Sequence, residues 1–317
     1  MRIALDAMGG DCAPKNTIEG AVLALKEYPY IEKLFLVGDA VATGNELKRL
    51  DFKDARIEIF HASEIVSMTE SAAKAVRHKK DASICRAVDL VKNGLAHAVV
   101  SAGYTGAAVV ACVLKLRTLK GIDRPAIACL LPTQNKVFVL IDGGANPDSN
   151  PENLVQFAIM GSVFSAHVLG YNNPSVALMS IGEENMQGND VTKEAFKLLK
   201  ASGLNFRGNI EGHDLFEKPA EVVVCDGFTG NVVLKTTEAV AHAIFSWLKL
   251  ELFRNPIRRL GAADPGNPGR VSSRAQRKAR SKDRFRPRNV LVRAAPQVRS
   301  RAGRIEIRPG SHLNALR

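Results

Sequence analysis

Over residues 1–235, short β-branched apolar runs alternate with longer stretches of helical periodicity. The runs that predict strands are 3–5, 33–37, 56–61, 98–101, 137–141, 175–180 and 221–224. The stretches that predict helices include 16–28, 83–93, 106–118, 151–169, 191–201 and 231–253. Because strands that alternate with helices indicate βαβ units, we expect an α/β fold with a mostly parallel sheet and helices on both faces.

The pattern changes after residue 261. A cluster of Gly, Pro, Ala, Asp and Asn fills 262–269, and an Arg-rich stretch without a clear period follows. Such a stretch buries too little apolar area to offset the entropy lost on ordering. We therefore expect an α/β domain at 1–261, with a helix protruding at about 237–253. We expect a poorly ordered tail at 262–317, with short strands at 290–293 or 304–307.

The positive charge belongs to this tail. The chain has a formal net charge of +12, from 44 basic and 32 acidic residues. Residues 262–317 hold 15 of the basic and 3 of the acidic residues, which leaves 29 of each in residues 1–261. The domain itself is neutral, so its composition gives no reason to expect a nucleic-acid partner.

Other features of the composition narrow the class of protein. No run approaches the ~18 apolar residues of a membrane-spanning helix, and Asp6 interrupts the first apolar run too early for a signal peptide. The five cysteines form no C-x-x-C pair, and the seven histidines show no ligand spacing. This pattern indicates reduced thiols in the cytoplasm and no metal site.

Five predicted strands end in loops of small and polar residues, at 6–11, 101–106, 142–146, 182–189 and 226–231. Glycines let backbone N–H groups approach an oxyanion, and a helix N-terminus adds a favourable dipole. We expect Thr105 and Gly106 to open one helix, and Gly230 and Asn231 another. One such loop is usually only a turn, but five at one rim of a parallel sheet favour a phosphate site. No G-x-G-x-x-G or P-loop motif is present, so a nucleotide cofactor is not expected.

These loops resemble those of the PlsX family, the acyl-acyl-carrier-protein:phosphate acyltransferases of bacterial phospholipid synthesis. The resemblance covers about residues 1–260. Its motifs are IALDAMGGD at 3–11, APK at 13–15, SAG at 101–103, TGA at 105–107, GIDRPA at 121–126, GAN at 144–146, QFAIMGSV at 156–163, IGEE at 181–184 and CDGFTGNV at 225–232.

The resemblance implies a three-layer α/β/α fold related to the isocitrate and isopropylmalate dehydrogenases and the phosphotransacetylases. It implies an enzyme that converts a fatty acyl-acyl-carrier-protein and inorganic phosphate into an acyl phosphate, without a cofactor. A homodimer is implied as well, in the cytoplasm at the inner face of the plasma membrane. There it would make peripheral contact with the membrane and with the glycerol-3-phosphate acyltransferase.

The sequence departs from the family pattern at three places. Tyr104 replaces the usual Asn of the loop at 101–107, which adds bulk and removes an amide. Ala82 stands where a Ser is common. The family's Tyr-Gly-Gly-Ala segment and its final His-Gly-Ser-Ser loop do not follow residue 261. The Arg-rich sequence in their place indicates a frameshift near this residue, which would remove part of the core.

The chemistry that we expect is attack of phosphate on the thioester carbonyl, with expulsion of a thiolate. Positioning and oxyanion stabilisation dominate such a step. The predicted catalytic residues are Lys193, Asn231 and Lys235. The predicted substrate-binding residues are Asp6, Gly9, Gly10, Ser101, Gly103, Thr105, Gly106, Asn146, Glu183, Asp226, Thr229 and Gly230. Each lysine can equally be an ordinary surface residue, and no recognisable triad motif supports Ser101 as a covalent nucleophile.

Two surfaces have open interpretations. The helix at 237–253 carries Val240, Ile244, Trp247, Leu248 and Leu252 at helical spacing, which suits packing in the core, packing in a dimer or contact with a membrane. The basic run at 77–80 is either a solvated face or the docking site of an acidic carrier protein.

Two alternative functions also remain open. One is an acyltransferase that uses other, shorter acyl thioesters, which chain-length preference would distinguish. The other is a truncated paralogue without activity that binds anions through its basic tail, which retention on heparin without turnover would distinguish.

Overall fold

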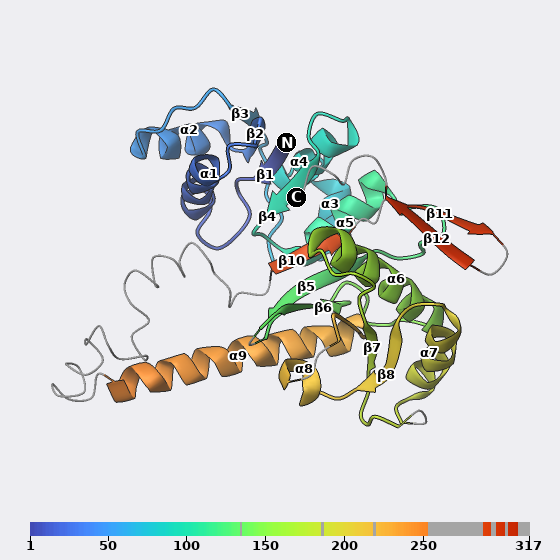
Figure 1. The fold of residues 1–317 in the computed structure, drawn as a ribbon. Helices are drawn as coiled ribbons and strands as arrows, with labels where there is room; N and C mark the ends of the chain where they lie inside the picture. Colours follow the sequence, from blue (N-terminus) through green and yellow to red (C-terminus); the bar gives the residue numbers. More distant parts are fainter. Residues whose placement is uncertain are drawn as a thin grey trace. The chain divides into compact units, whose positions relative to one another are not determined.

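The computed structural model describes residues 1–133, 135–184, 187–217, 220–252, 288–292, 296–301 and 304–309. It divides the chain into two compact units, Met1–Lys120 and Gly121–Arg317. We call them the N-terminal and the C-terminal unit and describe each by itself (Figure 1). The predicted strands are not joined in one sheet, because a separate sheet forms the centre of each unit.

The N-terminal unit has a four-stranded, fully parallel sheet in the order β3-β2-β1-β4. The strands are β1 (Arg2–Asp6), β2 (Lys33–Gly38), β3 (Ile57–His61) and β4 (Ala98–Ser101). The helices are α1 (Lys15–Glu27), α2 (Ala40–Arg49), α3 (Ala72–His78), α4 (Ser83–Lys92) and α5 (Thr105–Leu116).

Alternation along these strands explains why helices cover both faces of the sheet. Phe35 and Val37 of β2 pack in one apolar cluster with Leu90 of α4. Leu34 and Leu36, their neighbours in the sequence, pack on the opposite face with residues of α1. Successive side chains of a strand point to opposite faces, so an apolar run without polar interruption requires helices on both sides. The unit therefore has three layers.

The C-terminal unit has a mixed six-stranded sheet in the order β10-β5-β6-β9-β7-β8. The strands are β5 (Ala126–Pro132), β6 (Val137–Ile141), β7 (Val176–Met179), β8 (Phe206–Ile210), β9 (Val222–Val224) and β10 (Arg288–Val292). The helices are α6 (Pro151–Val168), α7 (Asp190–Ala201), α8 (Asp214–Glu217) and α9 (Gly227–Leu252). A separate two-stranded antiparallel sheet joins β11 (Pro296–Arg301) and β12 (Arg304–Pro309).

The α/β class and the dominance of parallel pairing are confirmed. The pairs β6–β9, β9–β7 and β7–β8 are parallel, whereas β5 runs antiparallel to both β6 and β10. The predicted strands omitted β5 and β8. The buried run of β5 has no alternation to reveal it, and β8 contains Gly208 and Asn209, two residue types that are uncommon in strands. Of the predicted tail strands, 290–293 overlaps β10 and 304–307 lies within β12.

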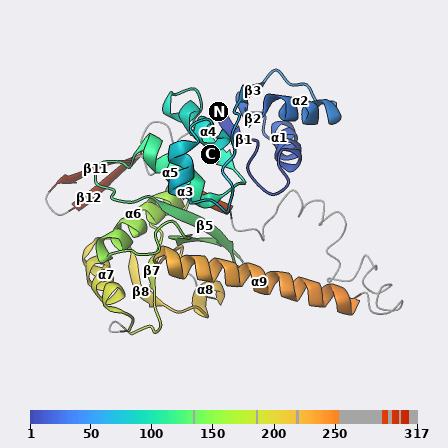
Figure 2. The same cartoon turned by 180° about the vertical axis from the view of Figure 1, so that it is seen from behind.

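The helix α9 extends beyond the sheet of its own unit, as both ribbon views show (Figures 1 and 2). Of its 26 residues, only Gly227, Gly230 and Leu234 are buried, all near its start. The apolar side chains farther along it are exposed, with Trp247 at 65% and Leu250 at 70%. Packing of this face in the core is therefore excluded, and the dimer and membrane interpretations remain. The sequence also places Arg254, Arg258 and Arg259 after this helix, where they would suit lipid phosphates, but residues 253–259 lie outside the described residues.

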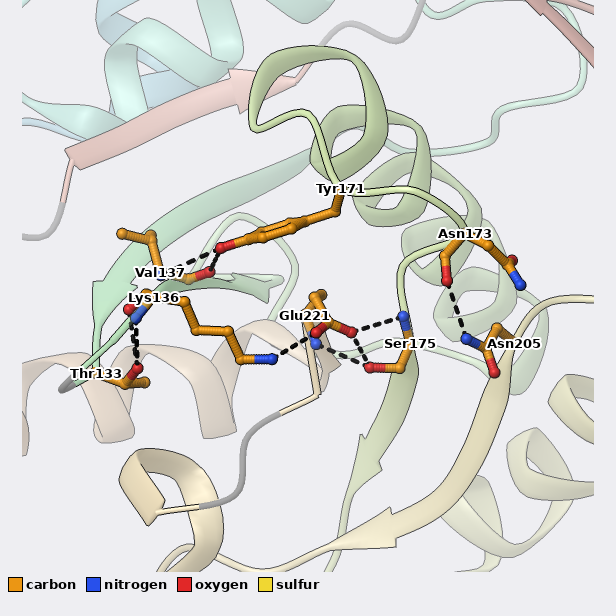
Figure 3. A network of polar contacts seen from close by, with 8 residues as sticks. All are labelled: Thr133, Lys136, Val137, Tyr171, Asn173, Ser175, Asn205 and Glu221. Atoms are coloured by element: carbon orange, nitrogen blue, oxygen red, sulfur yellow. Dashed lines mark hydrogen bonds and ion pairs between the residues drawn. The ribbon is translucent and has the colours of Figure 1, made fainter.

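An ion pair and hydrogen bonds centred on Glu221 join the amino ends of three neighbouring strands in the C-terminal unit (Figure 3). Glu221 precedes β9, and its Oε1 forms an ion pair at 2.5 Å with the ammonium of Lys136, which precedes β6. It also accepts hydrogen bonds from the backbone N–H and the hydroxyl of Ser175, which precedes β7. Burial alone would raise the pKa of Glu221, but the hydrogen bonds from Lys136 and Ser175 outweigh it and lower the pKa to about 2.

Acid is expected to weaken the C-terminal unit through Glu221. Its folded pKa lies below the ordinary value of 4.5, so its stabilising effect is complete above pH ~4.5 and is lost as the pH falls towards 2. We expect a loss of about 2 kcal/mol over this range from Glu221 alone. Urea unfolding at several pH values should show that Glu221→Gln removes this part of the pH dependence. The control Glu194→Gln, in a solvent-exposed pair with Lys197, should keep it, and an unchanged slope in Glu221→Gln would contradict the assignment.

Candidate functional site

The register of two parallel strands brings Asp6 and Ser101 together. The last residue of β1, Asp6, pairs directly with Ser101, the last residue of β4. The Ser101 hydroxyl donates to Asp6 Oδ2 at 2.7 Å, and its oxygen accepts from the backbone N–H of Gly103 at 3.1 Å. Asp6 is thus an acidic neighbour of Ser101 that lies 95 residues away in the sequence, too far for sequence spacing to reveal.

Two glycines of these loops are required because the two loop backbones lie very close together. A Cβ on Gly9 would lie 2.6 Å from Asp6 Oδ2 and 2.8 Å from Ser101 Oγ. A Cβ on Gly103 would lie 2.9 Å from the Cα of Gly9. Real Cβ atoms do not approach so closely, so the predicted glycines at 9 and 103 let two backbone segments enclose the Asp6–Ser101 pair.

Thr105 opens α5, as predicted, and Tyr104 occupies the N-cap position without a capping hydrogen bond. A Cβ on Gly106 would lie 2.9 to 3.1 Å from atoms of the Tyr104 ring, so this ring lies over the first turn. The Tyr104 side chain also packs against the apolar cluster of α3, α4 and α5. Within the described part of the chain, no side chain therefore caps the first-turn amides of α5.

In the C-terminal unit, the carboxylate of Asp142 organises the loop after β6. Asp142 is fully buried. Its Oδ1 accepts from the backbone N–H groups of Ile127, Gly144 and Ala145 at 2.9 to 3.2 Å. Its Oδ2 accepts from the backbone and the side-chain amide of Asn146 at 2.7 and 2.8 Å. These amides are satisfied within the protein, although the sequence suggested that they would bind phosphate.

Asn146 links this loop to the start of α9. Its side-chain amide also donates to the Pro125 carbonyl at 2.7 Å, so both of its amide hydrogens are used. Its own carbonyl accepts from the backbone N–H of Gly227 at 2.8 Å. Asn146 therefore connects β5, β6 and α9, rather than presenting a donor to a ligand.

The helix α9 begins at Gly227, three residues earlier than the sequence suggested. The prediction that Gly230 and Asn231 open the helix is thus wrong. Asp226 caps the helix, accepting from the backbone N–H and the hydroxyl of Thr229 at 2.8 and 2.9 Å. Gly230 is buried against the carbonyl oxygen of Asp142, whereas Asn231 is exposed beside Gly144.

The two candidate lysines have different surroundings. Lys193 lies in the first turn of α7, which Asn189 caps by accepting from the N–H of Thr192 at 2.9 Å. Lys193 is half-buried. Lys235 lies in the third turn of α9, where its side chain is 74% exposed and its ammonium lies 3.8 Å from Glu238. Glu183 is exposed in the loop after β7.

The five glycine-bearing loops form two groups instead of one rim. The loops after β1 and β4 lie at the carboxyl edge of the N-terminal sheet, with Asp6, Gly9, Gly10, Ser101 and Gly103. The loops after β6, β9 and β7 lie at the carboxyl edge of the C-terminal sheet. Among the described helices that follow these loops, α6, α7 and α9 have side-chain caps, whereas α1 and α5 have none. Both uncapped helices belong to the N-terminal unit, and α5 is the one that begins directly at its glycine-bearing loop.

Two cysteines near Asp142 are not suited to nucleophilic catalysis. Burial raises the pKa of Cys129 to about 12 and raises that of Cys225 as well. Both thiols are buried, and a thiol with a raised pKa contains little reactive thiolate. Among the described residues, no three His, Cys, Asp or Glu side chains gather to hold a metal ion.

Comparison with solved structures defines the class of protein first. The fold resembles that of a phosphotransacetylase from Streptococcus pyogenes, with a TM-score of 0.58, 19% identity and coverage of 76% of this chain and 82% of that chain. It also resembles the EutD phosphotransacetylase from Staphylococcus aureus, with a TM-score of 0.55, 19% identity and the same coverage. The chain is therefore an α/β protein with a phosphotransacetylase-like fold.

Sequence comparison then identifies the family. The model of the fatty acid synthesis protein family matches residues 1–263. A phosphate acyltransferase from Halothermothrix orenii is 50% identical over 262 residues, which cover 82% of this chain and 78% of that protein. One from Akkermansia muciniphila is 49% identical over 269 residues, covering 83% and 77%. The chain belongs to this family, the PlsX phosphate acyltransferases, and the family match ends where the composition changes.

Proposed function

We propose that the chain transfers a fatty acyl group from acyl carrier protein to inorganic phosphate, at an early step of phospholipid synthesis. The observation that carries this proposal is the identity of about 50% to named phosphate acyltransferases over 82% of the chain. Phosphate attacks the thioester carbonyl, a tetrahedral oxyanion forms, and the carrier thiolate leaves. A thiolate is a good leaving group, so positioning and charge stabilisation supply most of the catalysis.

The geometry suggests different roles for the candidate groups. The uncapped first turn of α5, at Thr105 and Gly106, is the proposed phosphate-binding element. Lys193 and Asn231 are proposed to stabilise the oxyanion, because both side chains reach solvent at the carboxyl edge of the C-terminal sheet. Asn146, Asp226, Thr229 and Gly230 support these groups through the internal contacts described above, and Lys235 is the weaker cationic candidate because it pairs with Glu238.

A phosphate-dependent thiol-release assay tests the function directly. Long-chain acyl-acyl-carrier-protein is incubated with the purified chain with and without phosphate, and the released thiol and the acyl phosphate are both measured. We expect thiol release and acyl phosphate formation only when phosphate is present. Short acyl-coenzyme A thioesters serve as the comparison, since a preference for them would indicate a different acyltransferase. No turnover with any thioester would favour a non-catalytic paralogue.

Replacing Lys193 with alanine is expected to lower kcat/KM about 100-fold, because loss of one oxyanion-stabilising group typically costs 10²–10³ in rate. Lys197→Ala is the matched control, since Lys197 lies one turn later on α7 and pairs with Glu194 in solvent. Steady-state kinetics should leave the control within a factor of about two. Equal activity in Lys193→Ala and Lys197→Ala would remove Lys193 from the site.

We further propose that the chain works in the cytoplasm as a homodimer, with peripheral contact at the membrane and with the glycerol-3-phosphate acyltransferase. The exposed apolar side chains of α9 support an external partner for that helix. The described residues contain no helix that is long and apolar enough to cross a membrane. Sedimentation at several concentrations, with and without anionic vesicles, separates dimerisation from lipid binding.

Two finer assignments complete the proposal. We infer the three-layer fold of the isocitrate and isopropylmalate dehydrogenases, which the layering within the N-terminal unit supports. We also infer that the reading frame changes near residue 261, because the family match stops at 263 and an Arg-rich composition follows. Resequencing the DNA around codon 261 tests the second inference.

A further inference from the structure

Asp6 has two carboxylate oxygens in different situations. The side chain is almost completely buried, with 3% of the residue exposed. Its Oδ2 accepts the Ser101 hydroxyl at 2.7 Å. Its Oδ1 is also buried, and within the described part of the chain it has no hydrogen-bond partner. Buried acceptors without a donor are uncommon in folded proteins, because desolvation is then not compensated.

The contacts of Asp6 and Ser101 explain why no described protein group donates a hydrogen bond to Asp6 Oδ1. Ser101 has its hydrogen directed to Asp6 and accepts the N–H of Gly103, so its hydroxyl has no second hydrogen to give. The backbone of Gly9 lies so close to the side chains of Asp6 and Ser101 that a Cβ at this position would not fit. The pair is thus held by backbone on one side and by its own hydrogen bond on another.

This arrangement has a definite chemical preference. Oδ1 of Asp6 is an acceptor, and the remaining lone pair of Ser101 Oγ is another. These two acceptors, one of which belongs to the buried carboxylate itself, repel a fully deprotonated oxyanion and favour a group that carries a hydrogen. The Asp6–Ser101 pair therefore differs from the amides at the start of α5, which favour bare anionic oxygens.

We propose that Asp6 accepts, through Oδ1, a hydrogen bond from a hydrogen-bearing group of a substrate, and that Ser101 is a positioning residue that fixes the carboxylate for this contact. The inference rests on the proposed function and deepens it. The reaction offers two sources of such a donor. One is the P–OH of hydrogen phosphate, and the other is an amide N–H or hydroxyl on the arm that carries the acyl thioester.

Asp6→Asn is the principal test, because it keeps the shape of the side chain and removes its charge. A hydrogen bond to a charged group lost in this way should lower kcat/KM for one substrate about 10- to 100-fold. Phosphate and acyl thioester are each varied at saturation of the other. A raised KM for phosphate alone identifies the P–OH group as the donor, and a raised KM for the thioester alone identifies the carrier arm.

Asp51→Asn is the matched control. Asp51 is an exposed carboxylate of the same unit, with φ of 46°, a backbone conformation that asparagine tolerates well. It should leave both KM values unchanged. Equal KM and kcat values in Asp6→Asn and Asp51→Asn would overturn the proposal, since a solvent molecule at Oδ1 would then explain the free acceptor.

Two further measurements keep the result decisive. If Asp6→Asn does not fold, Ser101→Ala should raise the same single KM about 3- to 10-fold, and Ser101→Thr, which keeps the hydroxyl, should restore it. If the parent protein shows no turnover, the proposed function fails, and calorimetric titration with inorganic phosphate and with acyl-coenzyme A still decides the inference. Equal affinities for both ligands in the parent and in Asp6→Asn would then refute it.

Discussion

Replacing Asp142 with asparagine is expected to lower the free energy of unfolding by about 3–5 kcal/mol. The buried carboxylate accepts five hydrogen bonds, which tie the loop after β6 to the start of β5. An asparagine side chain keeps one acceptor oxygen, but it sets an NH₂ group against the two donors of Asn146. Chemical denaturation by urea, followed by circular dichroism, measures the change.

Asp148→Asn is the control for this prediction. Asp148 lies in the same loop, but its side chain is exposed, and among the described residues its one hydrogen bond is that of its backbone carbonyl, which accepts from Arg124. Its stability should stay within about 0.5 kcal/mol of the parent. A similarly small loss in Asp142→Asn would mean that the loop is held by other contacts.

Replacing Gly230 with alanine is expected to cost at least about 3 kcal/mol and to remove activity with it. The added Cβ would overlap the carbonyl oxygen of Asp142 and approach Cys225 Sγ at 3.1 Å. The first obstacle is backbone, so no flexible side chain can move aside and α9 itself must shift. Thermal unfolding and the thiol-release assay, performed on the same preparation, measure both effects.

Gly20→Ala is the control, and it is expected to change the free energy of unfolding in the opposite direction. Gly20 lies within α1, and a Cβ there would meet nothing within 4 Å. Alanine should stabilise the protein by about 0.5–1 kcal/mol, because glycine loses more backbone entropy in a helix. If both variants changed stability in the same direction, close packing at Gly230 would not be the cause.

The sequence predicted local structure more completely than it predicted the candidate site. All seven predicted strands and six predicted helices are present, with ends shifted by a few residues. Periodicity reports burial along one element, so it worked where an element has a clear pattern. It failed for β5, whose buried run Ala126–Pro132 has no alternation, and for the start of α9, where the capping role of Asp226 went unrecognised.

The predicted site residues were selected by residue type, whereas their contacts in the structure distinguish internal supporting residues from exposed ones. Asn146 and Asn231 looked equivalent as amide donors, but the first is used internally and the second is exposed. In the sequence, Asp142 stands out only as the first residue of a glycine-bearing loop. Its central role depends on five donors from four residues, Ile127 and the consecutive residues 144–146, which residue type alone does not reveal.

By itself, the sequence determined the alternation of strands and helices, the neutral charge of the domain and the family to which the chain belongs. These properties follow from local composition, periodicity and ordered motifs. Only the tertiary structure decided that the strands divide into two sheets, that Asp6 meets Ser101, and that Asp142 satisfies the amides of the loop after β6. Each of these depends on strand register and on contacts between residues far apart in the chain, and hydrophobic periodicity does not specify either.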